Sequence, residues 1–138
     1  LLPCHPGCPP DMYAPLKTAP NARLVPPMPY PAFVAALAAA HLIITDSGGI
    51  QEEASALGIP TLVVRALTER PEVLETGTAI IVDTAKSGIL TAAMRLLDDD
   101  TAHRSMANAS TRIGDGKAAE RIARRLYDEM HAARRPAA

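Results

Sequence analysis

The sequence has few aromatic residues and almost no net charge. Its 138 residues include three tyrosines, one phenylalanine and no tryptophan, and the formal net charge at pH 7 is -1. Proteins that bind nucleic acid depend on a basic surface and on aromatic rings that stack against bases. The composition therefore argues against nucleic acid as a partner.

Long apolar stretches are also absent. None approaches the ~20 residues that a helix needs to cross a bilayer, so we expect no contact with a membrane. The chain begins with Leu1 rather than methionine, and no basic segment followed by a long apolar core marks a secretory signal. We expect a cytoplasmic protein whose beginning is missing from this sequence.

Cysteine is scarce. Cys4 and Cys8 are the only two, and His5 lies between them. Structural zinc takes four ligands, usually from two separated pairs, and the sequence has no second pair. We therefore expect no metal site and a reduced pair of thiols, with a disulfide as the alternative.

The most informative stretch begins at residue 42. Residues 42–45 form an apolar run rich in β-branched residues, which is typical of a strand buried on both faces. Asp46, Ser47 and two glycines follow at once, and helical spacing of apolar residues continues until Gly58. The amides at such a helix start can bind a phosphate. The alternative is that Asp46 or Ser47 is simply an N-cap beside a tight glycine turn.

The other segments extend this pattern. Ten of the thirteen prolines fall within residues 1–31, and proline limits regular structure there. We expect a three-layer α/β/α, Rossmann-like domain with one parallel sheet. Its strands are predicted near residues 1–4, 23–25, 42–45, 61–64 and 79–82.

The longer motif closely resembles the non-hydrolysing UDP-N-acetylglucosamine 2-epimerases. It reads D-S-G-G-I-Q-E-E-A at residues 46–54 and T-E-R-P-E at residues 68–72, and the similarity runs from about Val25 to Ile122. The resemblance implies half of a two-domain, glycosyltransferase-B-type fold. Residues 1–133 would be its carboxyl-terminal, nucleotide-sugar-binding domain, residues 134–138 a frayed tail, and the amino-terminal domain would be absent.

The resemblance also implies roles for individual residues. In the family, the positions of Ser47, Gly48 and Gly49 hold the diphosphate of UDP, that of Glu53 accepts hydrogen bonds from the ribose, and that of Arg70 contacts phosphate. Without the resemblance, Glu52 and Glu53 would be solvated helix charges, and Arg70 would pair with Glu69 or Glu72 on the surface.

Two further positions come from the amino-terminal part. Phe33 matches a family aromatic residue on the uracil side of the pocket, and packing against Ile43 or Leu62 is the alternative. His5 matches a histidine of a regulatory, phosphate-contacting surface. However, the family motif H-x-N-P reads His5-Pro6-Gly7-Cys8 here, so the asparagine amide is absent.

The implied activity is interconversion of UDP-N-acetylglucosamine and UDP-N-acetylmannosamine for cell-surface polysaccharide biosynthesis, without a cofactor. The expected partners are UDP-N-acetylglucosamine or UDP and the missing amino-terminal domain, and a homodimer is a further candidate. The family's acid and base carboxylates lie on that domain, so we expect no catalytic residue in this chain. A glycosyltransferase half-domain and a standalone nucleotide-sugar-binding module are the alternatives.

Overall fold

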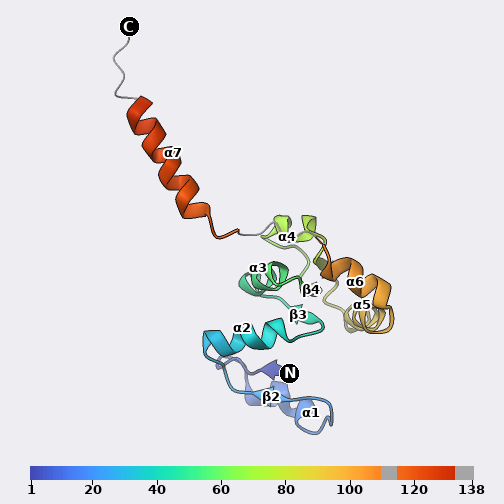
Figure 1. Cartoon of the computed structure of the whole chain (residues 1–138). Helices are drawn as coiled ribbons and strands as arrows, with labels where there is room; N and C mark the ends of the chain where they lie inside the picture. The colour runs from blue at the N-terminus through green and yellow to red at the C-terminus, as the bar shows by residue number, and fades with distance from the viewer. Residues whose placement is uncertain (110–114, 133–138) are drawn as a thin grey trace. The chain divides into compact units, whose positions relative to one another are not determined.

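The computed structural model describes residues 1–109 and 115–132 (Figure 1). The chain divides into two compact units, residues 1–39 and the residues from 40 onward, and each is described by itself. The expected frayed tail at residues 134–138 lies outside the described residues.

The first unit contains short elements. Strand β1 (Leu2–Pro3) pairs in parallel with strand β2 (Leu24–Val25). The two predicted strands are confirmed, although each has only two residues. The unit's helical segments are η1 (Pro10–Tyr13), α1 (Ala14–Lys17) and α2 (Tyr30–Ala38).

The second unit is built on a parallel sheet in the order β3 (Ile43–Thr45), β4 (Thr61–Val64) and β5 (Ala79–Val82). Thr45 lies opposite Val63, so the carboxyl ends of β3 and β4 are level. These strands agree with the predicted ones to within a residue, because each is a β-branched run without charge.

Helices cover both faces of this sheet (Figure 1). Leu62 and Val82 pack with Leu96 on one face, and Val63 and Ala79 pack with Val73 on the other. Period-two alternation along the strands therefore supplies two cores, and the predicted three-layer arrangement is confirmed. The covering helices are α3 (Gly48–Ala56) and α4 (Pro71–Glu75) on one face and α5 (Lys86–Asp98) and α6 (Asp100–Ala107) on the other.

The five expected strands are all present and are divided between the two units. The described strands form a two-stranded sheet and a three-stranded sheet. Prolines flank or interrupt both amino-terminal strands at Pro3, Pro26 and Pro27. Because proline cannot donate to a ladder, β2 ends before Pro26.

Helix α7 (Ala118–Ala132) is exposed along its described side chains. Within α7, the Arg121 guanidinium donates hydrogen bonds to the carboxylate of Asp115, which precedes the helix, and lowers the pKa of Asp115 to about 2. No helix among the described residues is both long and apolar enough to cross a bilayer.

Candidate functional site

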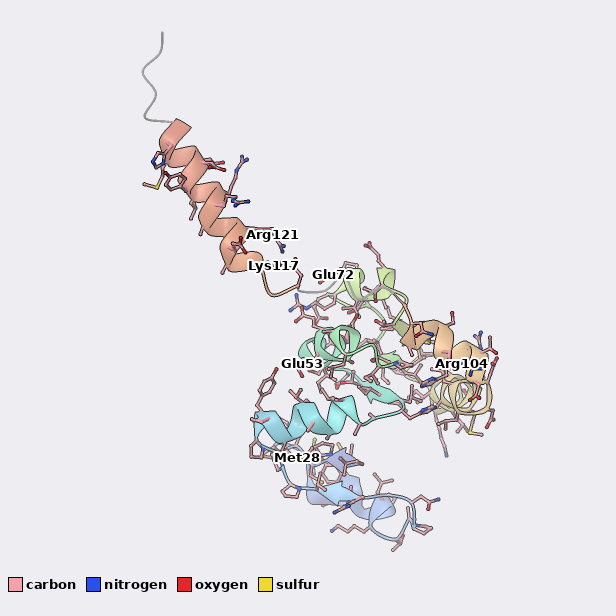
Figure 2. All side chains as sticks on the ribbon, in the orientation of Figure 1. Met28, Glu53, Glu72, Arg104, Lys117 and Arg121 are labelled. Atoms are coloured by element: carbon pink, nitrogen blue, oxygen red, sulfur yellow. The ribbon has the colours of Figure 1, made fainter. Side chains whose placement is uncertain are left out.

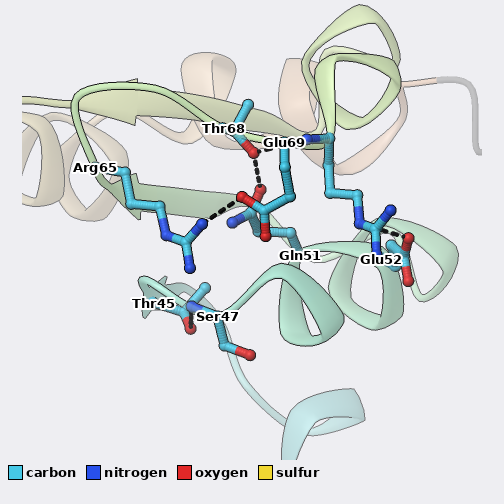
Figure 3. Close-up of polar contacts among 8 residues, drawn as sticks. Thr45, Ser47, Gln51, Glu52, Arg65, Thr68 and Glu69 are labelled. Atoms are coloured by element: carbon cyan, nitrogen blue, oxygen red, sulfur yellow. Dashed lines mark hydrogen bonds and ion pairs between the residues drawn. The ribbon is translucent and has the colours of Figure 1, made fainter.

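The polar residues of the sequence motif gather where β3 and β4 end (Figure 3). Ser47 follows β3 by two residues, and Arg65 follows β4 directly. In parallel sheets, this carboxyl edge is where ligands bind, because loops and helix starts meet there. The level ends of the two strands thus bring the motif's two halves together.

Ser47 occupies the N-cap position of α3 but makes no side-chain cap hydrogen bond. Its own amide donates to Thr45 Oγ1 at 3.1 Å. The first intrahelical bond runs from the amide of Gln51 to the Ser47 carbonyl, so the amides of residues 48–50 have no acceptor within the helix. The Ser47 hydroxyl is therefore not occupied by capping, as the simple N-cap interpretation required.

The two glycines of this turn have different surroundings. A Cβ added to Gly49 would meet no atom within 4 Å, whereas a Cβ added to Gly48 would collide with Glu69 Oε1. Gly49 therefore leaves open space for a ligand to approach the backbone. At Gly48, a carboxylate of the same chain already fills that space.

Arg70 reaches back to the start of α3. If Gly48 carried a Cβ, that atom would lie 3.8 Å from Arg70 Nε. Arg70 Nε also forms an ion pair with Glu52 Oε1 at 2.9 Å, although the geometry is not that of a hydrogen bond. The surface pair with Glu69 or Glu72 that the sequence offered as an alternative does not form. A guanidinium thus stands beside the helix start, held by a carboxylate that a phosphate can replace.

A buried hydrogen-bond chain holds the Arg70 backbone in place. The fully buried Gln51 accepts a hydrogen bond from Thr68 Oγ1 at 2.7 Å, and Thr68 Oγ1 accepts one from the Arg70 amide at 3.1 Å. Within the described part of the chain, the amide nitrogen Gln51 Nε2 is buried without a partner. Sequence reasoning missed Gln51, which lies on the buried side of α3 with Ala54 and Ser55.

Glu52 and Glu53 point in different directions, as expected of neighbours on a helix. Glu52 pairs with Arg70, whereas Glu53 Oε2 is buried and has no hydrogen-bond partner among the described residues. Glu53 is labelled on α3 in Figure 2. Buried polar atoms are nearly always hydrogen-bonded, so Glu53 has an unused acceptor that can take a hydrogen bond from a ligand hydroxyl.

The remaining predicted residues belong to the first unit. Phe33 is half-buried on α2 and His5 is exposed. The ring Nδ1 of His5 accepts a hydrogen bond from the Gly7 amide at 3.0 Å. Cys4 and Cys8 are free thiols, and no group of three or more His, Cys, Asp or Glu within residues 1–109 or 115–132 is placed to hold a metal.

The arrangement suits an anion with several oxygens. It combines free helix-start amides, an uncapped hydroxyl and two arginines at one sheet edge. Helix dipole and amides favour negative charge, and guanidinium groups bind phosphate oxygens in pairs. An unpartnered carboxylate on the same helix adds an acceptor for hydroxyl groups.

The comparisons with known proteins agree with this chemistry. The family model described as UDP-N-acetylglucosamine 2-epimerase matches residues 1–127. A probable UDP-N-acetylglucosamine 2-epimerase of Ralstonia solanacearum is 47% identical over 111 residues. That alignment covers 80% of this chain and 30% of the relative, so the chain spans less than a third of that relative's length.

Solved structures of similar proteins include ligand complexes. The UDP-GlcNAc 2-epimerase of Neisseria meningitidis bound to UDP-GlcNAc is 36% identical, with a TM-score of 0.78, over 85% of this chain and 32% of that one. The S. aureus MnaA structure with UDP is 37% identical, also with a TM-score of 0.78, over 86% of this chain and 32% of that one.

Proposed function

Because the chain belongs to the UDP-N-acetylglucosamine 2-epimerase family, we propose that it is the part of such an epimerase that binds the UDP moiety of the substrate. The observation that carries the proposal is that the Arg70 side chain lies beside Gly48 at the start of α3. A Cβ added to Gly48 would be 3.8 Å from Arg70 Nε. The diphosphate would bind there, against the amides and the hydroxyl of Ser47.

The proposed ligand also accounts for Glu53. Its buried, unpartnered Oε2 would accept hydrogen bonds from the ribose hydroxyls, in line with the role of the matching family residue. Phe33 would lie on the uracil side and His5 would contact a regulatory phosphate. These two roles rest on the family resemblance alone.

The proposed reaction is interconversion of UDP-N-acetylglucosamine and UDP-N-acetylmannosamine by elimination and readdition of UDP. Elimination adds negative charge to the leaving diphosphate, and the helix-start amides with Arg70 would stabilise that charge. Proton transfer at carbon 2 needs positioned acid and base groups, and in the family these carboxylates belong to the amino-terminal domain. We therefore expect this chain alone to bind UDP weakly and not to epimerise.

The full enzyme would act in the cytoplasm, in the biosynthesis of cell-surface polysaccharides, together with an amino-terminal domain. A homodimer is part of the same expectation. Incubation of the chain with UDP-N-acetylglucosamine tests the expectation directly, since formation of N-acetylmannosamine at ordinary enzyme rates would contradict it.

Binding of UDP is the test of the proposed site. We expect Arg70→Ala to weaken UDP binding at least tenfold, because hydrogen bonds to charged groups are worth about 1.5–3 kcal/mol. The Arg70–Glu52 pair is half-exposed, so the unfolding free energy falls by about 1 kcal/mol or less. NMR titration with UDP gives the affinity and urea denaturation gives the stability.

Arg104→Ala is the matched control. Arg104 is an exposed arginine on α6 (Figure 2) with no side-chain partner among the described contacts, and its removal should change the UDP affinity less than twofold. Ser47→Ala provides an independent variant of the site. If both Arg70→Ala and Ser47→Ala left the UDP affinity unchanged, UDP would bind elsewhere and the proposed site would be wrong.

A further inference from the structure

The carboxylate of Glu69 occupies the place beside the α3 start where an anion would bind. A Cβ on Gly48 would collide with Glu69 Oε1 and would lie 3.4 Å from Glu69 Cδ. No other side chain comes as close to that position. The carboxyl group therefore lies directly against the Gly48 backbone.

Glu69 also forms a salt bridge with Arg65, one of the two arginines of the site. Its Oε2 accepts a hydrogen bond from Arg65 Nη1, and the side chains of Arg65 and Glu69 are 35% and 50% exposed. Figure 3 shows this pair above the turn that contains Ser47. In the free chain, the first arginine after β4 is therefore neutralised by an internal carboxylate.

These contacts place the Glu69 carboxylate where a phosphate would bind, beside the Gly48 backbone and on the Arg65 guanidinium. A negative group lies at the positive end of α3 and takes a charge-assisted hydrogen bond from an arginine. A phosphate that approaches Gly48 meets a like charge at contact distance, which is unfavourable even near a protein surface. Both cannot occupy the position at once.

We propose that Glu69 is a specificity-determining residue, an internal competitor for the phosphates of the ligand. A phosphate binds at Gly48 only after Glu69 swings away and Arg65 exchanges the carboxylate for phosphate oxygens. Glu69 thus sets the affinity for anionic ligands and leaves the affinity for neutral ones unchanged. The inference rests on the proposed function, since it assumes that phosphate binds at this helix start.

The test compares the chain with its Glu69→Gln variant, which keeps the shape of the side chain and removes its charge. We expect the variant to bind UDP about tenfold more tightly in NMR titrations, because a like charge no longer opposes the phosphates. Uridine, which has the same base and ribose but no phosphate, should bind both proteins equally.

Glu72→Gln is the matched control. Glu72 is an exposed carboxylate three residues further along the chain, in the first turn of α4 (Figure 2), so the substitution changes the net charge by the same amount. UDP affinity should change less than twofold. A similar gain in both variants would show a general charge effect and overturn the role of Glu69.

The outcomes separate this inference from the proposed function. If the parent chain binds UDP and Glu69→Gln binds it no more tightly, the inference is wrong and the proposed function stands. If Glu69→Gln gains affinity for uridine as well, the electrostatic mechanism is wrong. If neither the parent chain nor Glu69→Gln binds UDP, both proposals are wrong.

Discussion

Residues 1–39 and residues 40–109 differ in how much apolar surface they bury. Of the nine buried hydrophobic residues in the described part of the chain, eight lie in residues 40–109 and one, Leu37, lies in residues 1–39. The strands differ in the same way, with two residues each in the first region and three or four in the second.

The difference shows where the candidate site obtains its rigidity. Ser47, Gly48 and Arg70 stand on elements anchored by the two cores of residues 40–109. Phe33 and His5 belong to residues 1–39, whose elements are short and bounded by prolines. We infer that the proposed phosphate site owes its geometry to the packing of residues 40–109.

The largest expected effect comes from the core. Leu62 is fully buried in the sheet, so Leu62→Ala should lower the unfolding free energy by about 3 kcal/mol through lost burial and a cavity. Leu2→Ala is the matched substitution in the first region, where the side chain is 39% exposed, and its loss should stay below about 1 kcal/mol. Urea denaturation measures the unfolding free energy of both variants. Equal losses would show that the two regions do not differ in the stability that their buried apolar side chains provide.

A buried hydroxyl network gives the next largest effect. Thr78 Oγ1 donates to Ser55 Oγ at 2.8 Å and lies 2.7 Å from Thr76 Oγ1, all within the interior between α3, α4 and β5. Thr78→Val keeps the shape but removes the central hydroxyl, so that Ser55 Oγ retains only its longer contact with Thr76 Oγ1, at 3.3 Å. We expect a loss of about 2 kcal/mol.

Thr91→Val is the control for that substitution, because Thr91 is exposed on α5. Its effect should lie within about 0.5 kcal/mol of zero. A loss at Thr78 as small as the loss at Thr91 would show that the interior of residues 40–109 tolerates unpaired hydroxyl groups.

Thr68 connects stability to binding and should give a smaller effect. Thr68→Val removes the hydrogen bond to Gln51 and the acceptor for the Arg70 amide. We expect a stability loss of about 1 kcal/mol and a UDP affinity reduced about threefold, since Arg70 loses its backbone anchor. Thr84→Val, on an exposed position, should change neither quantity, and unchanged UDP affinity in Thr68→Val would remove the positioning role.

For residues 40–109, the sequence predicts most of the secondary structure but few of the side-chain contacts. Residues 61–64 and 79–82 are strands as expected, because β-branched runs bounded by turn residues have few alternatives. The approach of Arg70 to Gly48 follows from parallel topology, which puts strand ends at one edge.

The pairing of carboxylates with arginines could not be predicted. Glu69 and Glu72 are close to Arg70 in the sequence, yet Arg70 pairs with Glu52 on α3. The choice depends on distances between α3 and the loop after β4. The same distances place Glu69 against Gly48 and Thr68 against Gln51. Local patterns do not contain that information.

The smallest expected effect concerns an exposed contact of the first region. A hydrogen bond with the Cys8 thiol raises the pKa of Tyr13 above its ordinary value near 10. The folded state therefore favours the neutral phenol, and this contribution to stability is present below pH ~10 and is lost as the pH rises through the raised pKa. Cys8→Ala should lower the pKa of Tyr13 toward its ordinary value.

Cys4→Ala is the control for Tyr13, because Cys4 acts on that hydroxyl only through charge and more weakly than Cys8. NMR titration of the tyrosine ring signals measures the pKa in each variant. The unfolding free energy near neutral pH should barely change with Cys8→Ala, since the contact is exposed. If instead Cys8→Ala destabilised the chain as strongly as Thr78→Val, polar contacts in residues 1–39 would contribute as much as buried ones, and the contrast between the two regions would fail.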